Sequence, residues 1–321
     1  MNVSDVNAKS RAGMGLLLVL ATAIVSGVST YVNLYAVQGT SSDVFVTVRN
    51  LVVAAALIPM AILTFGHARK RLSPWNWGRL ALIGLVGGAI PFLLFFHGLE
   101  LAAAAGGGPT ASFVYRTLFL MATVLGIVFL GERIRMRFLI GAVILLAGNV
   151  LLLSLISPIW VNGTGYVLAA TILWAAEYTM SRATLRDISP GTVALGRMGF
   201  GALFLVAYLA VTNQLTAAGN FTSGQWMWVG ISAAFLTIFV STWYAGLARV
   251  DLGTATSVLV LGFPVTYLLA VSFSNFPLTI ADLLGVVVIV AGVVLVIGRR
   301  LSRETWDVVV RALSPRRTQA P

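Results

Sequence analysis

Long apolar stretches alternate with short polar or turn-forming segments along almost the whole chain. A helix needs roughly 20 mostly apolar residues to cross the hydrocarbon core of a bilayer, and the stretches approach or exceed that length. Residues typical of turns, such as Ser157-Pro158 and Ser189-Pro190, stand between them. The pattern predicts ten membrane-spanning helices, over residues 14–37, 43–65, 79–99, 109–130, 138–156, 164–182, 190–211, 226–247, 253–274 and 280–298.

The basic residues are distributed unevenly between the segments that join these helices. If the N-terminus is cytoplasmic, every Lys and Arg except Arg49, Arg116 and Arg197 falls in or beside a cytoplasmic segment, and those three lie within predicted helices. Cytoplasmic loops of membrane proteins are enriched in basic residues. The distribution therefore predicts a multi-pass protein of the plasma membrane, the inner membrane in a bacterium, with both termini in the cytoplasm.

Composition supports this class and excludes others. The chain is 59% hydrophobic and 10% charged, whereas soluble domains carry about 25% charged residues. The net charge of +11 is explained by the basic loops, so we expect the lipid bilayer as a partner and no nucleic acid. The sequence has no cysteine, no HExxH or Walker A motif and no GxGxxG after a predicted strand. We therefore expect no cofactor, no metal and no enzymatic activity.

The two halves of the chain resemble each other. The segment RFLIGAVILLAGNVLLL (137–153) matches ADLLGVVVIVAGVVLVI (281–297), and VTVRN around Arg49 matches ALGRM around Arg197. Each half holds five predicted helices, and because five is odd the second half enters the membrane from the opposite side. The sequence thus predicts an inverted repeat, typical of secondary transporters, over residues 14–156 and 164–298, followed by a cytoplasmic tail over 299–321. Chance similarity between Gly- and Leu-rich helices is the alternative.

These segments resemble a known family. FVYRTLFLMATVLGIVFLGERI (113–134) resembles the fourth helix of an EamA repeat of the drug/metabolite transporter superfamily, and FLGER (129–133) is its most specific part. ILWAAEYTMSRATLRDISPGTVALGRMGFGALFL (172–205) resembles the first two helices of a second repeat. The resemblance covers about 14–298, and length and aromatic content are similar to the YddG-like amino-acid exporters. Ser26 stands where the family pattern has a Trp, opposite Trp174.

The resemblance implies a ten-helix carrier, functional as a monomer. Helices 1–4 and 6–9 would surround a central cavity, and helices 5 and 10 would lie at the periphery. The activity implied is secondary export of small organic solutes, chiefly amino acids, including aromatic ones, and related metabolites, by alternating access. A channel-like permease in the same fold is one alternative. A non-transport intramembrane enzyme or assembly factor is another.

Charged residues within predicted helices are candidates for function, because burying a charge in a membrane is costly. Glu177 and Arg197 lie at similar depth in consecutive antiparallel helices, so we predict an ion pair between them. The pair either couples transport to protons or only supports packing. Arg49 and Arg116 either bind a substrate carboxylate or extend to the outer interface.

Aromatic and polar residues away from the predicted interfaces suggest a substrate site. Aromatic side chains lining a mostly apolar cavity suit amphipathic ligands, although Trp and Tyr also populate interfacial belts. For His97, a structural hydrogen bond to a carbonyl is the alternative to binding. The substrate-binding candidates are Tyr31, Phe95, His97, Tyr115, Trp174, Tyr178, Trp243, Tyr244 and Ser257.

Single cysteines introduced at positions 40, 162 or 218 test the orientation, because the chain has no native cysteine. With cytoplasmic termini, these positions fall in outside loops, so a membrane-impermeant thiol reagent added to intact cells should label each one. Labelling from the cytoplasmic side alone would contradict the predicted topology.

Overall fold

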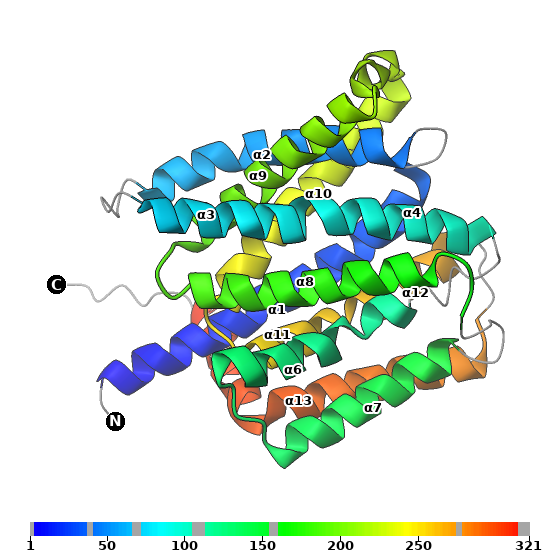
Figure 1. Cartoon of the computed structure of the whole chain (residues 1–321). Helices are drawn as coiled ribbons and strands as arrows, with labels where there is room; N and C mark the ends of the chain where they lie inside the picture. The colour runs from blue at the N-terminus through cyan, green and yellow to red at the C-terminus, as the bar shows by residue number, and fades with distance from the viewer. Residues whose placement is uncertain are drawn as a thin grey trace.

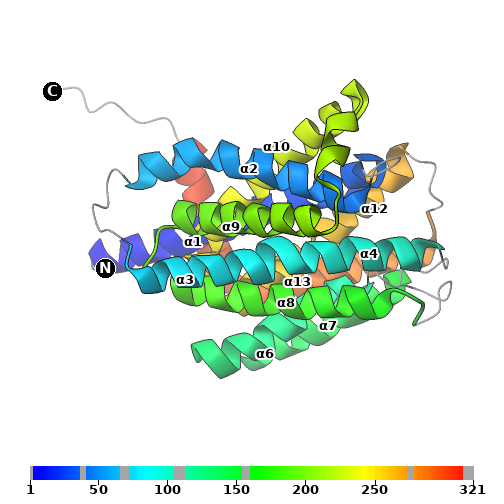
Figure 2. The ribbon, with the colours of Figure 1, turned by 45° about the horizontal axis from the view of Figure 1, so that its top comes forward.

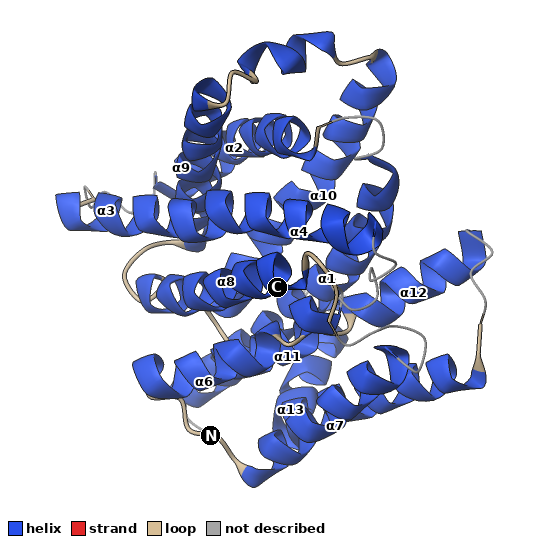
Figure 3. Cartoon of the chain, turned by 45° about the vertical axis from the view of Figure 1, so that its right-hand side comes forward, coloured by secondary structure: helices blue, strands red, loops and turns tan. Residues whose placement is uncertain are grey.

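The computed structural model describes residues 3–36, 41–65, 72–104, 113–153, 160–273 and 278–313. The helices run side by side along one direction, back and forth between the two ends of a single bundle (Figures 1 and 2). All regular secondary structure in these described ranges is helical (Figure 3). The start of α1 (Val3–Ala36) and the end of α13 (Ile280–Leu313) lie at the same end of the bundle, here called the N-terminal face.

The remaining elements follow the predicted spans closely. In the first half they are α2 (Ser42–Phe65), α3 (Pro74–Ile83), the π-helix η1 (Gly84–Ala89), α4 (Ile90–Ala104), α6 (Leu118–Leu130) and α7 (Met136–Leu153). In the second half they are α8 (Thr164–Thr184), α9 (Pro190–Val211), the short 3-10 helix η2 (Leu215–Asn220), α10 (Ser223–Leu247), α11 (Leu252–Leu259) and α12 (Gly262–Phe273).

Eight helical segments in the described ranges are long and apolar enough to cross a membrane. The apolar part of α7, Met136–Leu151, is shorter than the others. Helix α8 is not among the eight, and its polar residues include Glu177 at its centre. Both run alongside the other helices in Figure 1. The chain is thus a multi-pass helical membrane protein, and the count of ten crossings stays a prediction.

Three predicted boundaries are corrected by local chemistry. The predicted span 79–99 begins at Pro74, because Ser73 caps the helix by accepting from the N–H of Asn76. The span predicted to start at 226 begins at Ser223, after a capping box between Thr222 and Gln225. The span 253–274 is two helices, since Pro264 cannot donate to the carbonyl of Val260 four residues before it.

Helices of opposite halves interleave at the centre of the bundle. Helix α1 packs on α10, α2 on α9, and α4 and α6 on α8. Helices α7 and α13, the fifth and tenth predicted spans, pack together at one edge (Figure 1). A Cβ on Gly141 would lie 2.7 Å from Val296 Cγ2 and 3.0 Å from the carbonyl oxygen of Gly292. Glycine therefore allows these two helices to approach closely.

Helix α13 bends at Gly298, whose φ is 67°, and its last part lies against α1. A Cβ on Gly13 would lie 2.5 Å from the carbonyl oxygen of Glu304. Trp306 and Val310 in this last part are 67% and 42% exposed, so their surface remains available to contact a membrane surface.

Candidate functional site

A cavity of about 1000 Å³ lies between the two halves of the bundle. Its mouth, at the end of the bundle opposite the N-terminal face, includes Ser41 and Asp43 before and at the start of α2, Glu100 of α4 and Gln214 after α9. Its walls come from both halves, from α1, α2, α4, α8, α9 and α10 and from Tyr115 and Arg116 just before α6. The cavity therefore lies where relative movement of the halves would change its shape.

A helix of the first half that contains the π-helical segment η1 holds side chains of the second half at this cavity. Pro91 has no N–H to donate to the carbonyl of Gly87, and the backbone at Gly84–Ala89 is a π-helix. The carbonyl oxygen of Gly87 accepts hydrogen bonds from Trp174 Nε1 and Arg197 Nη2, both at 3.1 Å. The next carbonyl, of Gly88, accepts from Asn50 Nδ2 at 3.2 Å.

The predicted ion pair is present in a layer of buried polar side chains below the cavity floor. Arg197 Nε lies 3.5 Å from Glu177 Oε2. Glu177 Oε1 accepts from Ser181 Oγ at 2.5 Å and from Tyr244 Oη at 2.7 Å. Glu177 is fully buried, and a Cβ on Gly87 would lie 2.2 Å from its Cγ, so a side chain at position 87 would displace Glu177.

Three aromatic rings meet in the cavity wall and are here called the aromatic cluster. The ring centroids of Phe95, Tyr115 and Trp174 lie 5.3 to 5.4 Å apart, with edge-to-face or tilted geometry. Tyr178 also lines the cavity, with its ring 4.6 Å from that of Trp243 behind it. His97 lines the cavity and lies edge-to-face with Tyr166, 4.9 Å away.

Four of the predicted substrate-binding residues lie outside the cavity lining. Trp243 and Tyr244 are fully buried, so the prediction that they line the cavity is wrong. These two residues of α10 face α8, where Trp243 packs on Tyr178 and Tyr244 donates a hydrogen bond to Glu177. The other two are Tyr31, whose hydroxyl lies 3.1 Å from that of Tyr35, and Ser257, which is buried in α11.

All three intramembrane arginines line the cavity. Arg49 is 2% exposed and Arg116 is 8% exposed, so neither extends to an interface. The guanidinium of Arg49 donates to Asn50 Oδ1 and lies 5.0 Å from the ring centroid of Phe92. The guanidinium of Arg116 lies 5.6 Å from the ring of Tyr115. Each guanidinium thus rests on an aromatic ring beside the cavity.

Two residues that sequence analysis did not single out contribute to the site. Phe92 joins the aromatic cluster through Trp174, at 5.4 Å between ring centroids, and lies beneath two guanidinium groups. Asn50 connects Arg49 to the π-helix η1 through the carbonyl of Gly88. An amide in the middle of a predicted apolar helix, directly after an arginine, is a pattern that could have identified Asn50.

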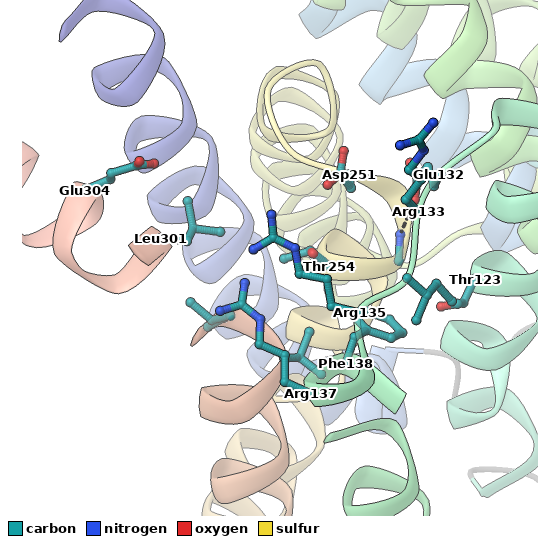
Figure 4. Close-up of a pocket in the computed structure, with 14 residues that line it drawn as sticks. Thr123, Glu132, Arg133, Arg135, Arg137, Phe138, Asp251, Thr254, Leu301 and Glu304 are labelled. Atoms are coloured by element: carbon teal, nitrogen blue, oxygen red, sulfur yellow. Dashed lines mark hydrogen bonds between the residues drawn. The ribbon is translucent and has the colours of Figure 1, made fainter. Parts of the chain in front are cut away.

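Contacts between the halves close the N-terminal face. Glu132 accepts hydrogen bonds from the backbone N–H groups of Leu252 (2.6 Å) and Gly253 (3.2 Å) at the start of α11. Burial raises the pKa of Glu132, and these two N–H groups oppose that shift. A pocket of about 460 Å³ beside it is lined by Arg133, Arg135 and other residues (Figure 4).

The ion pair should matter more for stability than an exposed pair elsewhere. Glu177→Gln leaves Arg197 buried without its counter-charge, so we expect a loss of about 3–5 kcal/mol in the free energy of unfolding. Adding Arg197→Gln should recover part of it. Asp187→Asn, which breaks the exposed Arg79–Asp187 pair (3.3 Å), is the control and should cost less than about 1 kcal/mol.

Denaturant titration in detergent micelles gives the free energy of unfolding of the wild type, Glu177→Gln, the double variant and Asp187→Asn. An equal loss in Glu177→Gln and Asp187→Asn would mean that the buried layer does not depend on the charge pair.

Comparison with known proteins identifies a family profile and two similar proteins. The sequence profile of the EamA-like transporter family matches residues 13–154 and again residues 161–298. A WAT1-related protein of Arabidopsis thaliana is 22% identical over 286 residues, which cover 80% of this chain and 71% of the relative. The permease-like protein YdzE of Bacillus subtilis is 39% identical over 72 residues, 22% of this chain and 87% of that protein.

The fold is also similar to that of a protein with a crystal structure. The two structures superpose with a TM-score of 0.69 at 20% sequence identity, covering 89% of this chain and 97% of the other. Because the family profile matches nearly the whole chain as two consecutive repeats, the chain belongs to the EamA-like transporter family of the drug/metabolite transporter superfamily.

Proposed function

We propose that the protein is a secondary transporter that exports small organic solutes, most of all amino acids, including aromatic ones, and related metabolites. The observation that carries the proposal is a cavity between two inverted repeats that is open at one face and sealed at the other. With cytoplasmic termini, the open face is outside the cell, and the structure corresponds to the state in which an exporter releases its substrate. The protein would act in the plasma membrane, the inner membrane of a bacterium, as a monomer.

Three contacts between the repeats support a carrier that alternates between two states. The hydrogen bond from Arg197 Nη2 to the carbonyl oxygen of Gly87 lies at the cavity floor, and the Glu132–α11 contact lies at the N-terminal face. The ion pair between Arg79 and Asp187 also joins the repeats. A substrate entering from the cytoplasm would require these contacts to separate. When these contacts form again, the cavity would open to the outside once more, as alternating access requires.

The lining of the cavity supports an amphipathic substrate with an acidic group. Its volume of about 1000 Å³ is at the upper end of typical small-ligand pockets. The aromatic cluster offers a surface for an apolar or aromatic side chain. Guanidinium groups bind carboxylates in bidentate fashion. Amino acids and related metabolites combine these features.

Flux measurements distinguish a carrier from the two alternatives, a channel-like permease and a non-transport enzyme or assembly factor. A channel-like permease needs a continuous path, whereas Trp243, Tyr244 and Glu177 form a fully buried layer below this cavity. An intramembrane enzyme or assembly factor would need no flux at all. Saturable counterflow in proteoliposomes supports the carrier, and linear flux supports the channel.

Trp174→Ala tests the cavity as the substrate site. Trp174 contributes its ring to the aromatic cluster, so we expect its loss to raise the substrate concentration for half-maximal counterflow roughly tenfold, the effect of losing one stacking contact. Trp226→Ala, at a 47% exposed surface position, is the matched control and should leave that concentration unchanged. A well-folded Trp174→Ala variant with the wild-type value would place the substrate elsewhere.

Proton coupling through Glu177 is tested with the double variant Glu177→Gln/Arg197→Gln, which removes both buried charges together. We expect this variant to keep substrate exchange and to lose any response to an imposed pH gradient, because its layer can no longer take up a proton at position 177. Wild-type flux that is indifferent to the gradient would leave Glu177 with a structural role alone.

A further inference from the structure

The cavity contains two buried cations that no group among the described residues neutralises. In the part of the chain that the structure describes, Arg197 is paired with Glu177, whereas neither Arg49 nor Arg116 forms an ion pair. The guanidinium of Arg49 hydrogen-bonds only to the neutral side chain of Asn50, and Arg116 Nε has no hydrogen-bond partner. Both side chains are more than nine-tenths buried and line the cavity.

Unpaired charges at this depth are costly, and they are retained where they act on a ligand or an ion. Rings of Arg or Lys select anions in membrane pores, because they lower the energy of a negative charge that has lost its water. The guanidinium groups of Arg49 and Arg116 therefore attract an anion into the cavity.

The acidic residues of the cavity are poorly placed to bind an ammonium group next to these arginines. Asp43 and Glu100 lie at the mouth, and Asp43 accepts a hydrogen bond from Tyr208 at 3.2 Å. Glu177 is sealed below the floor by Ser181 and Tyr244. The deep part of the cavity is thus positively charged.

The four aromatic rings next to these arginines do not provide an alternative site for a cation. Arg49 lies over the rings of Phe92 and Phe96, at 5.0 and 5.9 Å from their centroids. Arg116 lies over the rings of Tyr115 and Phe263, at 5.6 and 5.1 Å. These ring faces already interact with cations, so a substrate ammonium would meet like charge there.

From this arrangement we infer that the substrate is an organic acid with a net negative charge, whose carboxylate is bound by Arg49 and Arg116 while its apolar body packs on the aromatic cluster. The inference rests on the proposed function and, among its small organic solutes, selects carboxylates that lack a compensating ammonium group over the amino acids.

Ligands that differ in charge but share a skeleton test the inference with the wild-type protein. One set is 3-phenylpropionate, phenylalanine and 2-phenylethylamine, and the other is 4-methylpentanoate, leucine and 3-methylbutylamine. Calorimetric titration of the purified protein gives the affinities, and counterflow in proteoliposomes gives transport. We expect the acid to bind at least about tenfold more tightly than the amine, because charge-assisted hydrogen bonds to one guanidinium exceed one decade in affinity. We expect a similar margin over the zwitterion, because its ammonium would be buried near the arginines without an acceptor.

Variants then assign the effect to the two arginines. Arg49→Gln and Arg116→Gln should each weaken binding of the acid by about tenfold or more, and the Lys variants, which keep the charge, should recover part of the loss. Arg133→Gln is the matched control, because Arg133 is exposed and lines the separate pocket at the N-terminal face, and it should have no effect (Figure 4).

Three results would overturn the inference: a zwitterion or amine that binds as tightly as its matched acid, acids that do not bind, or wild-type affinity in both Gln variants. Saturable counterflow of the zwitterions without preference for the acids would reject the inference and support the proposed transporter. Binding of the acids without counterflow of any ligand would support the anion site and contradict the proposed transporter.

Discussion

The carbonyl oxygen of Gly87 lies in the middle of a helix, at a depth where water does not replace a missing hydrogen bond. Because Pro91 cannot donate to it, this oxygen requires donors from other helices. Trp174 and Arg197 of the second repeat supply them. Arg197 in turn pairs with Glu177, which receives two hydroxyl hydrogen bonds. One absent N–H in the first repeat thus fixes the orientation of the cavity floor in the second.

Glycine makes this arrangement sterically possible. A Cβ on Gly88 would lie 2.4 Å from the carbonyl oxygen of Arg197, and one on Gly201 would lie 2.7 Å from the carbonyl carbon of Gly88. The backbones of the two repeats are therefore in direct contact beside the polar layer. A buried ion pair is weak evidence for stability, because its desolvation offsets much of its attraction. The role of this pair is better described as fixing the position of one repeat relative to the other.

Sequence patterns predicted where helices begin and end and how deep a residue lies within its helix. Pro190–Val211 begins and ends as predicted because Ser189 caps it and Pro190 occupies its first turn. The pair between Glu177 and Arg197 followed from equal depth in consecutive helices. Helix rotation could not be predicted, because it depends on neighbours distant in sequence. For this reason Trp174 faces the cavity as expected, whereas Trp243, also distant from the interfacial belts, faces another helix.

The two repeats are unequal at corresponding positions of their first helices. Helix α8 places Trp174, Glu177 and Tyr178 at or below the cavity, and α1 lines it with the small side chains Ser26, Ser29 and Thr30. Exchanging the roles of the repeats therefore cannot generate a second cavity of the same shape and polarity. If the protein alternates between inward- and outward-facing states as proposed, these two states must differ in free energy even without substrate or an ion gradient. An idle population of the protein would then rest unevenly between the two states, and the concentration of substrate at the less populated face would set the rate of turnover.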